Sequence, residues 1–371
     1  MKIMTVIGAR PQFIKCAPVS RCLRKCATEI LVHTGQHYDL DMSDCFFHQL
    51  QLPEPNYNLG IGSATHAKQT GEMLIAIENL LLQEKPEVLL VYGDTNSTLA
   101  GALAAAKLQI PIAHVEAGLR SFNSRMPEEL NRILTDHVSS RLFCPTNTAV
   151  DNLAREGITN GVQLVGDVMF DALWQHHLVA DSQSTILQKL TLSPKSYFLA
   201  TIHRAENTDN LSKLVIIIET LLELSRSGTP VVLPLHPRTR KKLAETNLDV
   251  TCSKMILTRP VSYIDMLKLE SNAKAILTDS GGVQKEAFWL SVPCVTLRDE
   301  TEWVETVASG WNFVAGVDRF RILRYVYGIN DHFSGKSPVG EDGHAAERIV
   351  ASITSKSCDW VCTRPLGAHT C

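Results

Sequence analysis

The sequence predicts an α/β protein made of two doubly wound units, each a parallel sheet with helices between its strands. Three observations lead to this fold class. The chain has 371 residues, a length that ordinarily divides into two domains. Short apolar segments alternate with helical ones, which is typical of right-handed βαβ units. The alternation then restarts after residue 195.

The first half supplies one set of strands and helices. Apolar segments of strand length lie at residues 3–7, 29–33, 88–92, 112–115, 141–144 and 162–165. Segment 70–84 has apolar residues three or four positions apart, and segment 98–108 is rich in alanine, so both are predicted to be helices. Because residues 88–92 are apolar throughout, we expect a strand that is buried on both faces of a parallel sheet.

The second half repeats the pattern. Predicted strands lie at residues 198–202, 230–233, 254–257, 275–277 and 294–296, with predicted helices at 211–226, 240–245 and 283–290. We place the domain boundary near residue 170, which gives a first domain of residues 1–170 and a second of residues 171–343. The segment 344–371 contains a helical stretch at 345–353. We consider an arrangement in which this segment packs back on the first domain. Two such domains predict a ligand cleft between them, at the carboxyl ends of the strands.

Composition excludes several classes of protein. The formal net charge is -3, whereas a dedicated nucleic-acid binder usually carries a basic excess. The ten cysteines are scattered and form no Cys-x-x-Cys pair, so we expect no zinc set and a reducing, cytoplasmic location. No apolar stretch reaches the ~20 residues of a spanning helix, and we expect no membrane association.

A glycine pair after a strand is the sharpest local signal. In the segment 279–286, Ser280, Gly281 and Gly282 follow an apolar strand and open a helix. Glycines let backbone N–H groups approach an anion, and a helix N-terminus adds positive partial charge, so this turn is predicted to hold a diphosphate. Glu286 lies one turn further and is placed to accept ribose hydroxyls. The alternative is a tight turn with glycine for steric reasons alone; a Gly-x-Gly-x-x-Gly nicotinamide motif is absent.

Two cations follow the first strand. Arg10 and Lys15 lie in the segment 8–15, where a glycine turn leads into a helix with Pro11 near its start. A helix N-terminus is electrostatically the wrong end for cations. Their position therefore favours a role in neutralising a leaving diphosphate over two incidental surface charges.

Carboxylates and histidines complete the predicted constellation. Asp94 and Glu116 each follow a predicted strand, and Glu128 follows a loop. Carboxylates that share one cleft acquire different pKa values, which provides an acid and a base. The alternatives are a helix cap for Asp94 and a helix first turn for Glu128. His203 and His236 also follow strands, where a histidine can move protons near neutral pH.

These motifs, in this order, resemble the non-hydrolysing UDP-N-acetylglucosamine 2-epimerase family. The resemblance rests on residues 8–15, 93–95, 114–120, 127–132, 166–167, 203–207, 279–286 and 298–302. It implies the two-domain GT-B architecture and inversion at C2 of a UDP-linked 2-acetamido sugar, without metal or cofactor. The course it implies is elimination of UDP to a 2-acetamidoglucal, followed by re-addition with the proton on the other face. UDP-N-acetylglucosamine would become UDP-N-acetylmannosamine, a precursor of bacterial surface polysaccharide, and a homodimer is expected.

The resemblance also distributes roles among the residues. It implies that Asp94, Glu116, Glu128 and His203 carry out the proton transfers and assist the leaving group. It does not assign each acid to one face of C2. The residues expected to bind UDP or the sugar are Arg10, Lys15, Arg120, Arg132, His236, Ser280, Gly281, Gly282, Glu286, Arg298 and Glu302.

Departures from the family pattern leave other functions open. Gln12 stands where the family usually has Glu, and Ala205 stands where an Arg helps bacterial relatives hold an activating second substrate molecule. The variant motifs also resemble the branch that acts on UDP-2,3-diacetamido-2,3-dideoxyglucuronate, for whose added carboxylate Arg125 or Arg238 is a candidate partner. A hydrolysing epimerase, a GT-B glycosyltransferase and a catalytically inactive nucleotide-sugar sensor are the remaining alternatives.

Overall fold

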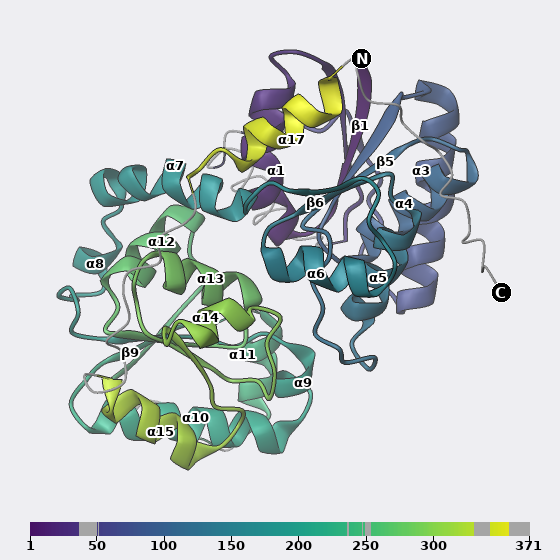
Figure 1. Cartoon of the computed structure of the whole chain (residues 1–371). Coiled ribbons are helices and arrows are strands. Elements are labelled where there is room, and N and C mark those ends of the chain that lie inside the picture. The colour runs from purple at the N-terminus through teal and green to yellow at the C-terminus, as the bar shows by residue number, and fades with distance from the viewer. Residues whose placement is uncertain are drawn as a thin grey trace. The chain divides into compact units, whose positions relative to one another are not determined.

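The chain divides into two compact units of parallel β-structure (Figure 1). The computed structural model describes residues 1–36, 50, 52–235, 237–246, 248, 254–329 and 342–355. The first unit comprises Met1–Ala172 together with the described part of Glu341–Cys371, and the second comprises Leu173–Gly340 within the same limits. The predicted fold class, two doubly wound units, is confirmed.

The first unit contains a parallel sheet of seven strands among the described residues, in the order β3-β2-β1-β4-β5-β6-β7. These strands are β1 (Lys2–Ile7), β2 (Thr28–His33), β3 (Tyr57–Asn58), β4 (Val88–Tyr92), β5 (Ile112–Val115), β6 (Arg141–Cys144) and β7 (Val162–Leu164). The helices are α1 (Arg10–Leu23), α3 (His66–Glu84), α4 (Asn96–Lys107), α5 (Pro127–Val138), α6 (Asn147–Arg155), the start of α7 (Val168–Gln183) and α17 (Ala345–Thr354). The sheet order reverses between β1 and β4, which is where open α/β sheets bind ligands.

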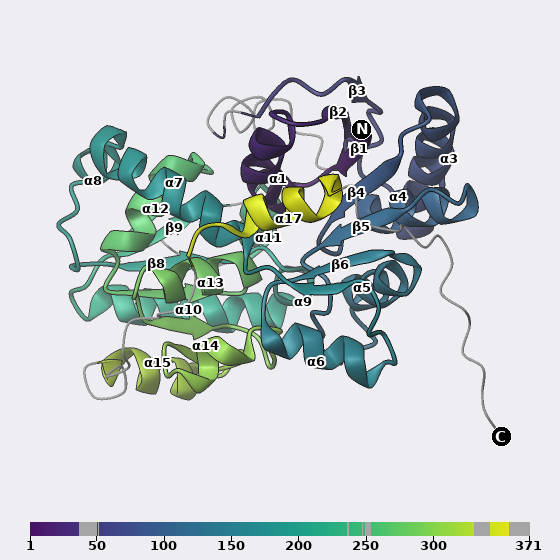
Figure 2. The same cartoon turned by 45° about the horizontal axis from the view of Figure 1, so that its top comes forward.

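Helices cover both faces of this sheet. On one face, α3 and α4 pack together, and Met73, Ile77 and Ala100 join the strand residues in one apolar cluster. On the other face, α1 lies beside α17, as both views show (Figure 2). The C-terminal helix therefore returns to the first unit. Every residue of β4 is buried, as its unbroken apolar sequence predicts.

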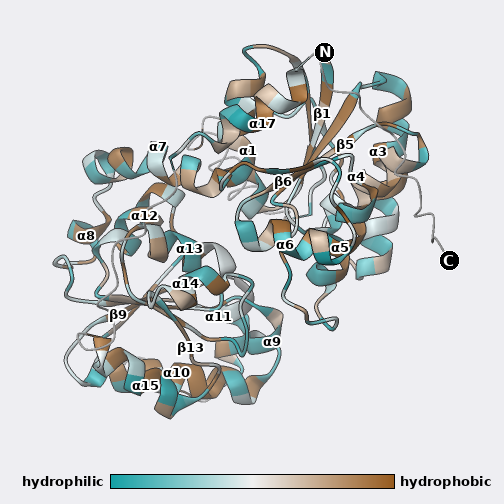
Figure 3. Cartoon of the chain, in the orientation of Figure 1, coloured by the Kyte–Doolittle hydropathy of each residue, from teal (hydrophilic) through white to brown (hydrophobic). Residues whose placement is uncertain are grey.

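The second unit repeats the plan with a sheet of six strands among the described residues, in the order β10-β9-β8-β11-β12-β13. These are β8 (Phe198–Thr201), β9 (Val231–Pro234), β10 (Met255–Thr258), β11 (Ala275–Thr278), β12 (Cys294–Thr296) and β13 (Asn312–Val314). The helices are α8 (Ile186–Lys189), α9 (Ala205–Thr208), α10 (Leu211–Arg226), α11 (Pro237–Ala244), α12 (Tyr263–Asn272), α13 (Gly281–Trp289), α14 (Val304–Ala308) and α15 (Arg319–Tyr327). Figure 3 shows strands of both sheets largely in the brown of hydrophobic residues. The apolar faces of α10 and α15 pack in one cluster against the sheet.

Local sequence explains where the elements near the strand ends begin. Thr95 caps α4 by accepting a hydrogen bond from the backbone N–H of Thr98, so the helix begins at Asn96, two residues before the predicted start. The alternative interpretation of Asp94 as the helix cap is therefore wrong. Ser280 caps α13 in the same way, through the N–H of Val283 at 3.5 Å. In both cases a short hydroxyl side chain satisfies a helical N–H that has no partner within the helix.

Candidate functional site

Residues of the first unit that were predicted to be functional gather at the carboxyl ends of its central strands. Lys15 projects from α1, Asp94 follows β4, and Glu116 follows β5. β4 pairs in parallel with both β1 and β5, so the polar residues that follow these strands meet at one edge of the sheet. The fold thus assembles charges that are about a hundred residues apart in the chain.

Lys15 and Glu116 form a buried ion pair at this edge. The Lys15 Nζ donates to Glu116 Oε2, and the two residues are only 7% and 8% exposed. Burial raises the pKa of Glu116, Lys15 opposes that rise, and the charges of Asp167 and Asp94 add to it, so the pKa lies above its usual value. Burial also works against the charge on Lys15, but Glu116, Asp94 and Asp167 raise the pKa of Lys15 above its ordinary value. Glu116 is therefore a carboxyl group set to exchange a proton closer to neutral pH than an exposed glutamate.

The backbone around this pair is strained, and one glycine makes room for it. A Cβ atom on Gly93 would lie 3.2 Å from Glu116 Oε2 and 3.4 Å from Lys15 Nζ. Gly93 has φ +62°, and Glu116, which is not a glycine, has φ +70°. A non-glycine residue in this conformation costs about 1–3 kcal/mol and is concentrated at functional sites. The Gly93 turn therefore lets the Lys15–Glu116 pair approach the backbone that carries Asp94.

Asp94 is held by an arginine of the next helix. Arg132 donates from Nε at 3.0 Å and from Nη2 at 2.7 Å to the same carboxylate oxygen, Oδ2. Its Nη1 donates to Glu129 at 2.6 Å. Asn131 donates to the Asp94 carbonyl at 2.9 Å. One turn of α5 thus fixes both the side chain and the backbone of Asp94.

The neighbouring acids Glu128 and Glu129 differ in their surroundings. Both lie in the first turn of α5. Glu129 is 2% exposed and accepts hydrogen bonds from the backbone N–H groups of Ser121 and Phe122. Glu128 is half-buried. Glu129 therefore anchors a loop, whereas Glu128 retains the access to solvent that a proton-transfer group needs.

Arg120, predicted to bind the substrate, lies in a buried charge network. Its guanidinium donates to Asp136 Oδ2 at 2.7 Å and, through Nε and Nη2, to both carboxylate oxygens of Glu156. The other oxygen of Asp136 meets His114 Nδ1 at 2.7 Å, and His114 Nε2 meets the Gly93 carbonyl at 2.8 Å. Burial works against a charged Asp136, but His114 and Arg120 lower its pKa below the usual value. Arg120 therefore stabilises the Gly93 turn indirectly, through Asp136 and His114.

Gln12, the departure from the family pattern, is buried with both ends of its amide engaged. Its Oε1 accepts from the backbone N–H groups of Gly8 and Ala9 at 2.8 and 3.0 Å. Its Nε2 donates to the Tyr92 carbonyl at 2.9 Å and to Thr98 Oγ1 at 3.0 Å. An amide supplies both the acceptor and the donors that this position needs. Gln12 therefore joins the start of α1 to the end of β4. Arg10, the other predicted cation of this segment, is the first residue of α1 and is half-buried.

In the second unit, the glycine pair opens α13 as predicted. Gly281 is the first residue of α13 after the Ser280 cap, and Gly282 follows it at a half-buried position. A Cβ atom on Gly281 would lie 2.6 Å from Glu302 Oε1 and 3.1 Å from Trp303 Nε1. The glycine thus leaves room for the side chains of Glu302 and Trp303, whatever ligand binds at the helix.

His203 follows β8 and is positioned by Asp279. The Asp279 carboxylate accepts from the backbone N–H groups of His203 at 3.1 Å and of Arg204 at 3.1 Å, and from Asn207 Nδ2 at 3.1 Å. The His203 Nδ1 atom lies 3.3 Å from Asp279 Oδ1. Asp279 is fully buried. Asp279 lies in the predicted segment 279–286, but no role was predicted for it. Its position directly after a strand and before the glycine pair is the sequence feature that could have indicated one.

Two other predicted residues of the second unit, Arg298 and Glu302, form a buried ion pair with more exposed charged neighbours. Arg298 Nη1 donates to Glu302 Oε2 at 3.0 Å, and Arg298 Nε lies 3.5 Å from Glu206 Oε1. Glu302 Oε1 also lies 4.0 Å from Arg204 Nη2. Glu286 is 4% exposed within α13. His236 lies outside the described residues.

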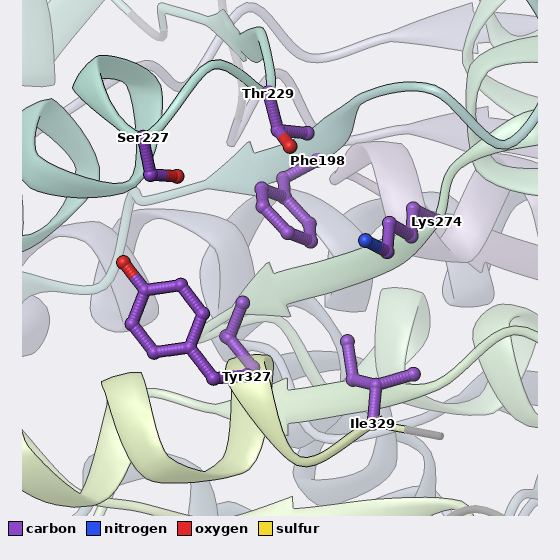
Figure 4. Close-up of a pocket in the computed structure, with 7 residues that line it drawn as sticks. Phe198, Ser227, Thr229, Lys274, Tyr327 and Ile329 are labelled. Atoms are coloured by element: carbon purple, nitrogen blue, oxygen red, sulfur yellow. The ribbon is translucent and has the colours of Figure 1, made fainter.

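A small hollow lies elsewhere in the second unit. It has a volume of about 80 Å³ and is lined by Phe198, Ser227, Thr229, Lys274, Val326, Tyr327 and Ile329 (Figure 4). Phe198 is the first residue of β8, so this hollow lies at the amino ends of the strands, away from His203 and Ser280. In the described ranges, no three His, Cys, Asp or Glu residues are grouped so that they could hold a metal ion. Among the helices whose structure is described, none is long and apolar enough to cross a membrane.

Two doubly wound units with polar residues at the carboxyl ends of their strands define a protein of the GT-B class. A sequence profile described as UDP-N-acetylglucosamine 2-epimerase matches residues 22–354. The chain belongs to the UDP-N-acetylglucosamine 2-epimerase family.

Similar proteins include both branches that the sequence left open. A Methanocaldococcus jannaschii UDP-N-acetylglucosamine 2-epimerase is 47% identical, over 95% of this chain and 99% of its own length. A Pseudomonas aeruginosa UDP-2,3-diacetamido-2,3-dideoxy-D-glucuronate 2-epimerase is 52% identical, over 87% of this chain and 90% of its own length. A crystal structure of the M. jannaschii enzyme in complex with UDP-N-acetylglucosamine and UDP superposes with a TM-score of 0.88 at 46% identity, over 95% of this chain and 99% of that one.

Proposed function

We propose that this protein interconverts UDP-N-acetylglucosamine and UDP-N-acetylmannosamine by inverting the configuration at C2. The observation that carries the proposal is the buried Lys15–Glu116 pair beside Asp94, with the pKa of Glu116 raised by burial. The C2 proton of the sugar is weakly acidic, so its removal requires a carboxylate base at close range in a site with little water. Family membership supplies the class of reaction, and the buried pair supplies a group suited to it.

The reaction balances as an elimination followed by an addition. A carboxylate takes the proton from C2, the C1–O bond breaks, and UDP leaves with the bonding electrons while a C1–C2 double bond forms. A second acid then gives a proton to the opposite face of C2 as the UDP oxygen returns to C1. We assign these proton transfers to Asp94, Glu116 and Glu128, without fixing which acid serves which face. His203, held by Asp279, is assigned to the departing or returning UDP.

Binding of UDP is assigned chiefly to the second unit. The backbone N–H groups at Ser280, Gly281 and Gly282 begin α13, and a helix N-terminus favours a diphosphate through its free N–H groups and its dipole. Glu286 is assigned to the ribose. We assign Arg10, Lys15, Arg132, His236, Arg298 and Glu302 to binding of the sugar or the leaving group, and Arg120 to an indirect, positioning role.

A second substrate has specific support. The relative that acts on UDP-2,3-diacetamido-2,3-dideoxy-D-glucuronate is 52% identical to this chain, slightly more than the 47% of the M. jannaschii epimerase. The two substrates undergo the same chemistry at C2 and differ in the groups at C3 and C5. The chemical steps above apply unchanged to either one.

One assay tests the reaction and separates the two substrates. Each UDP-sugar is incubated with the protein in D2O, and the products are followed by NMR. Epimerisation predicts deuterium at C2 in two UDP-linked epimers, and the preferred substrate shows the higher kcat/KM. Free sugar would indicate a hydrolysing enzyme, and absence of any change with both substrates would contradict the proposal and favour a sensor or a glycosyltransferase.

Three further expectations belong to this proposal. The substrate is expected to bind in a cleft between the two units, which close on it and exclude water from the glucal. A homodimer and a cytoplasmic location are expected from the family. The five cysteines in the described part of the chain, Cys16, Cys22, Cys26, Cys144 and Cys294, are all free thiols, which is compatible with a reducing compartment. Small-angle scattering with and without UDP tests the closure through the radius of gyration.

A further inference from the structure

His114 lies on β5 and reaches the turn that carries Asp94. It is fully buried, and its Nε2 atom lies 2.8 Å from the Gly93 carbonyl oxygen. The next carbonyl along the turn, that of Asp94, accepts from the Asn131 side chain at 2.9 Å. Of these two side chains, His114 is the one that can carry a positive charge. The proposed reaction leaves His114 without a role.

Both ring nitrogens of His114 face oxygen atoms that accept hydrogen bonds. The Gly93 carbonyl has no proton to donate, so Nε2 must carry one. Nδ1 lies 2.7 Å from Asp136 Oδ1, and the other oxygen of that carboxylate accepts from the Gly118 N–H at 3.1 Å and from Arg120 Nη1 at 2.7 Å. These donors favour an ionised Asp136, which can only accept from Nδ1. Because a neutral imidazole has a single N–H, this geometry requires both ring nitrogens to be protonated.

The charges around His114 favour the same state. Arg120 is one cation between two anions, since it donates to Asp136 and, through Nε and Nη2, to Glu156 at 2.7 and 2.8 Å. Burial raises the pKa of the Cys144 thiol on β6 to about 12, and the charge of Asp136 adds to that rise, so this thiol stays neutral. A positive His114 gives the group two cations and two anions. A neutral His114 would leave Asp136, which is fully buried, with a share of only one cation.

We propose that His114 is a doubly protonated imidazolium that positions the Gly93 turn, and with it Asp94, for the reaction. The positioning role rests on the proposed function, whereas the protonation state does not. Asp136 lies on α5, the helix whose Arg132 holds the Asp94 side chain. His114 therefore fixes the backbone of the turn to the same helix that fixes the carboxylate.

The protonation state is tested in the full-length protein without substrate. Proton–nitrogen-15 correlation NMR distinguishes ring nitrogens that carry a proton from those that do not, and His114→Gln identifies the signals of His114. At about pH 8 an ordinary exposed histidine is neutral and has one protonated nitrogen. We expect both ring nitrogens of His114 to carry protons at that pH. A single protonated nitrogen would overturn the inference.

Two amide variants test the positioning role. The amide nitrogen of asparagine lies near the place of Nδ1 and that of glutamine near the place of Nε2, so His114→Gln can still donate to the Gly93 carbonyl and His114→Asn cannot. Both variants lose the positive charge beside Asp136, and both should unfold at a lower urea concentration. We expect kcat to fall ~10²-fold in His114→Asn and much less in His114→Gln, while UDP affinity changes little in either. His137→Gln, at an exposed position next to Asp136, is the control and should change none of these quantities.

The outcomes separate this inference from the proposed function. Equal loss of kcat in His114→Gln and His114→Asn would overturn the positioning role, because the contact with Gly93 would then make no difference to turnover. A doubly protonated His114 in a protein that epimerises neither UDP-sugar would uphold the charged state of His114 and overturn the proposed reaction instead.

Discussion

Arg132 directs two of its donors at a single oxygen of Asp94, with Nε at 3.0 Å and Nη2 at 2.7 Å. The guanidinium is nearly fully buried, and its remaining arm reaches Glu129. This planar, two-point contact fixes the orientation of the carboxylate more tightly than a single ammonium group does. Asp94 is thus held in one orientation, as its proposed role at C2 of the sugar requires.

Arg132→Lys should therefore reduce turnover more than it reduces binding. Lysine retains the charge but loses the two-point contact with Asp94 and the contact with Glu129, and a misplacement of about 1 Å can cost ~10²-fold in rate. We expect kcat to fall by about that factor while UDP affinity, measured by calorimetry, falls much less. Arg155→Lys, at an exposed position at the end of α6, is the control. Equal loss of kcat in both variants would contradict this role for Arg132.

Glu128→Gln and Glu129→Gln should separate chemistry from structure at adjacent positions. Glu128 is half-buried, and loss of a general acid or base typically costs ~10²–10⁴-fold in rate. Glu129→Gln weakens a buried acceptor of the Ser121 and Phe122 N–H groups, at a cost of about 1–3 kcal/mol in stability. Turnover measures the first effect and urea unfolding the second. A fully active Glu128→Gln would remove Glu128 from the mechanism.

Lys15→Met should change both stability and pH dependence. It leaves Glu116 buried without its cationic partner, which typically costs about 3–5 kcal/mol. Because Lys15 lowers the pKa of Glu116, its removal raises that pKa, and the acid limb of any remaining activity moves to higher pH. Lys2→Met removes the ammonium from the more exposed Lys2–Glu84 pair and should change urea unfolding little. A stability as high as that of Lys2→Met would show that the buried pair contributes nothing.

Gly281→Ala should weaken UDP binding without a general loss of stability. The new Cβ would lie 2.6 Å from Glu302 Oε1, so either the Glu302 carboxylate or the turn before α13 must shift. We expect UDP affinity to fall on the order of tenfold, which corresponds to about 1.4 kcal/mol. Gly71→Ala in α3 is the control, since nothing lies within 4 Å of its Cβ position, and it should stabilise the helix by about 1 kcal/mol. Unchanged affinity in Gly281→Ala would separate this turn from UDP binding.

Much of the fold follows from local sequence. Strand β4 has the predicted bounds, Val88–Tyr92, and helix α10 has the predicted bounds, Leu211–Arg226, because an unbroken apolar run and a helical period are properties of neighbouring residues. The strands β3 and β13 were not predicted. β3 has only two residues and β13 has three, and each contains an asparagine, so neither is an apolar run. Pairing of β3 with β2 and of β13 with β12 makes them strands.

The candidate site likewise has features that follow from local sequence and features that depend on tertiary contacts. The positions of Asp94, Glu116 and His203 after strands, and of a glycine pair at the start of α13, could be predicted because strand ends and helix starts follow from short local patterns. Three contacts could be found only in the three-dimensional structure: Glu116 pairs with Lys15, Arg132 holds Asp94, and Arg120 donates to Asp136 and Glu156. These contacts join residues from 16 to 101 positions apart. The packing of helices on the sheet brings these partners together, and the cost of burying an unpaired charge favours their pairing. Both effects depend on residues that are distant in the chain, so local sequence patterns do not reveal them.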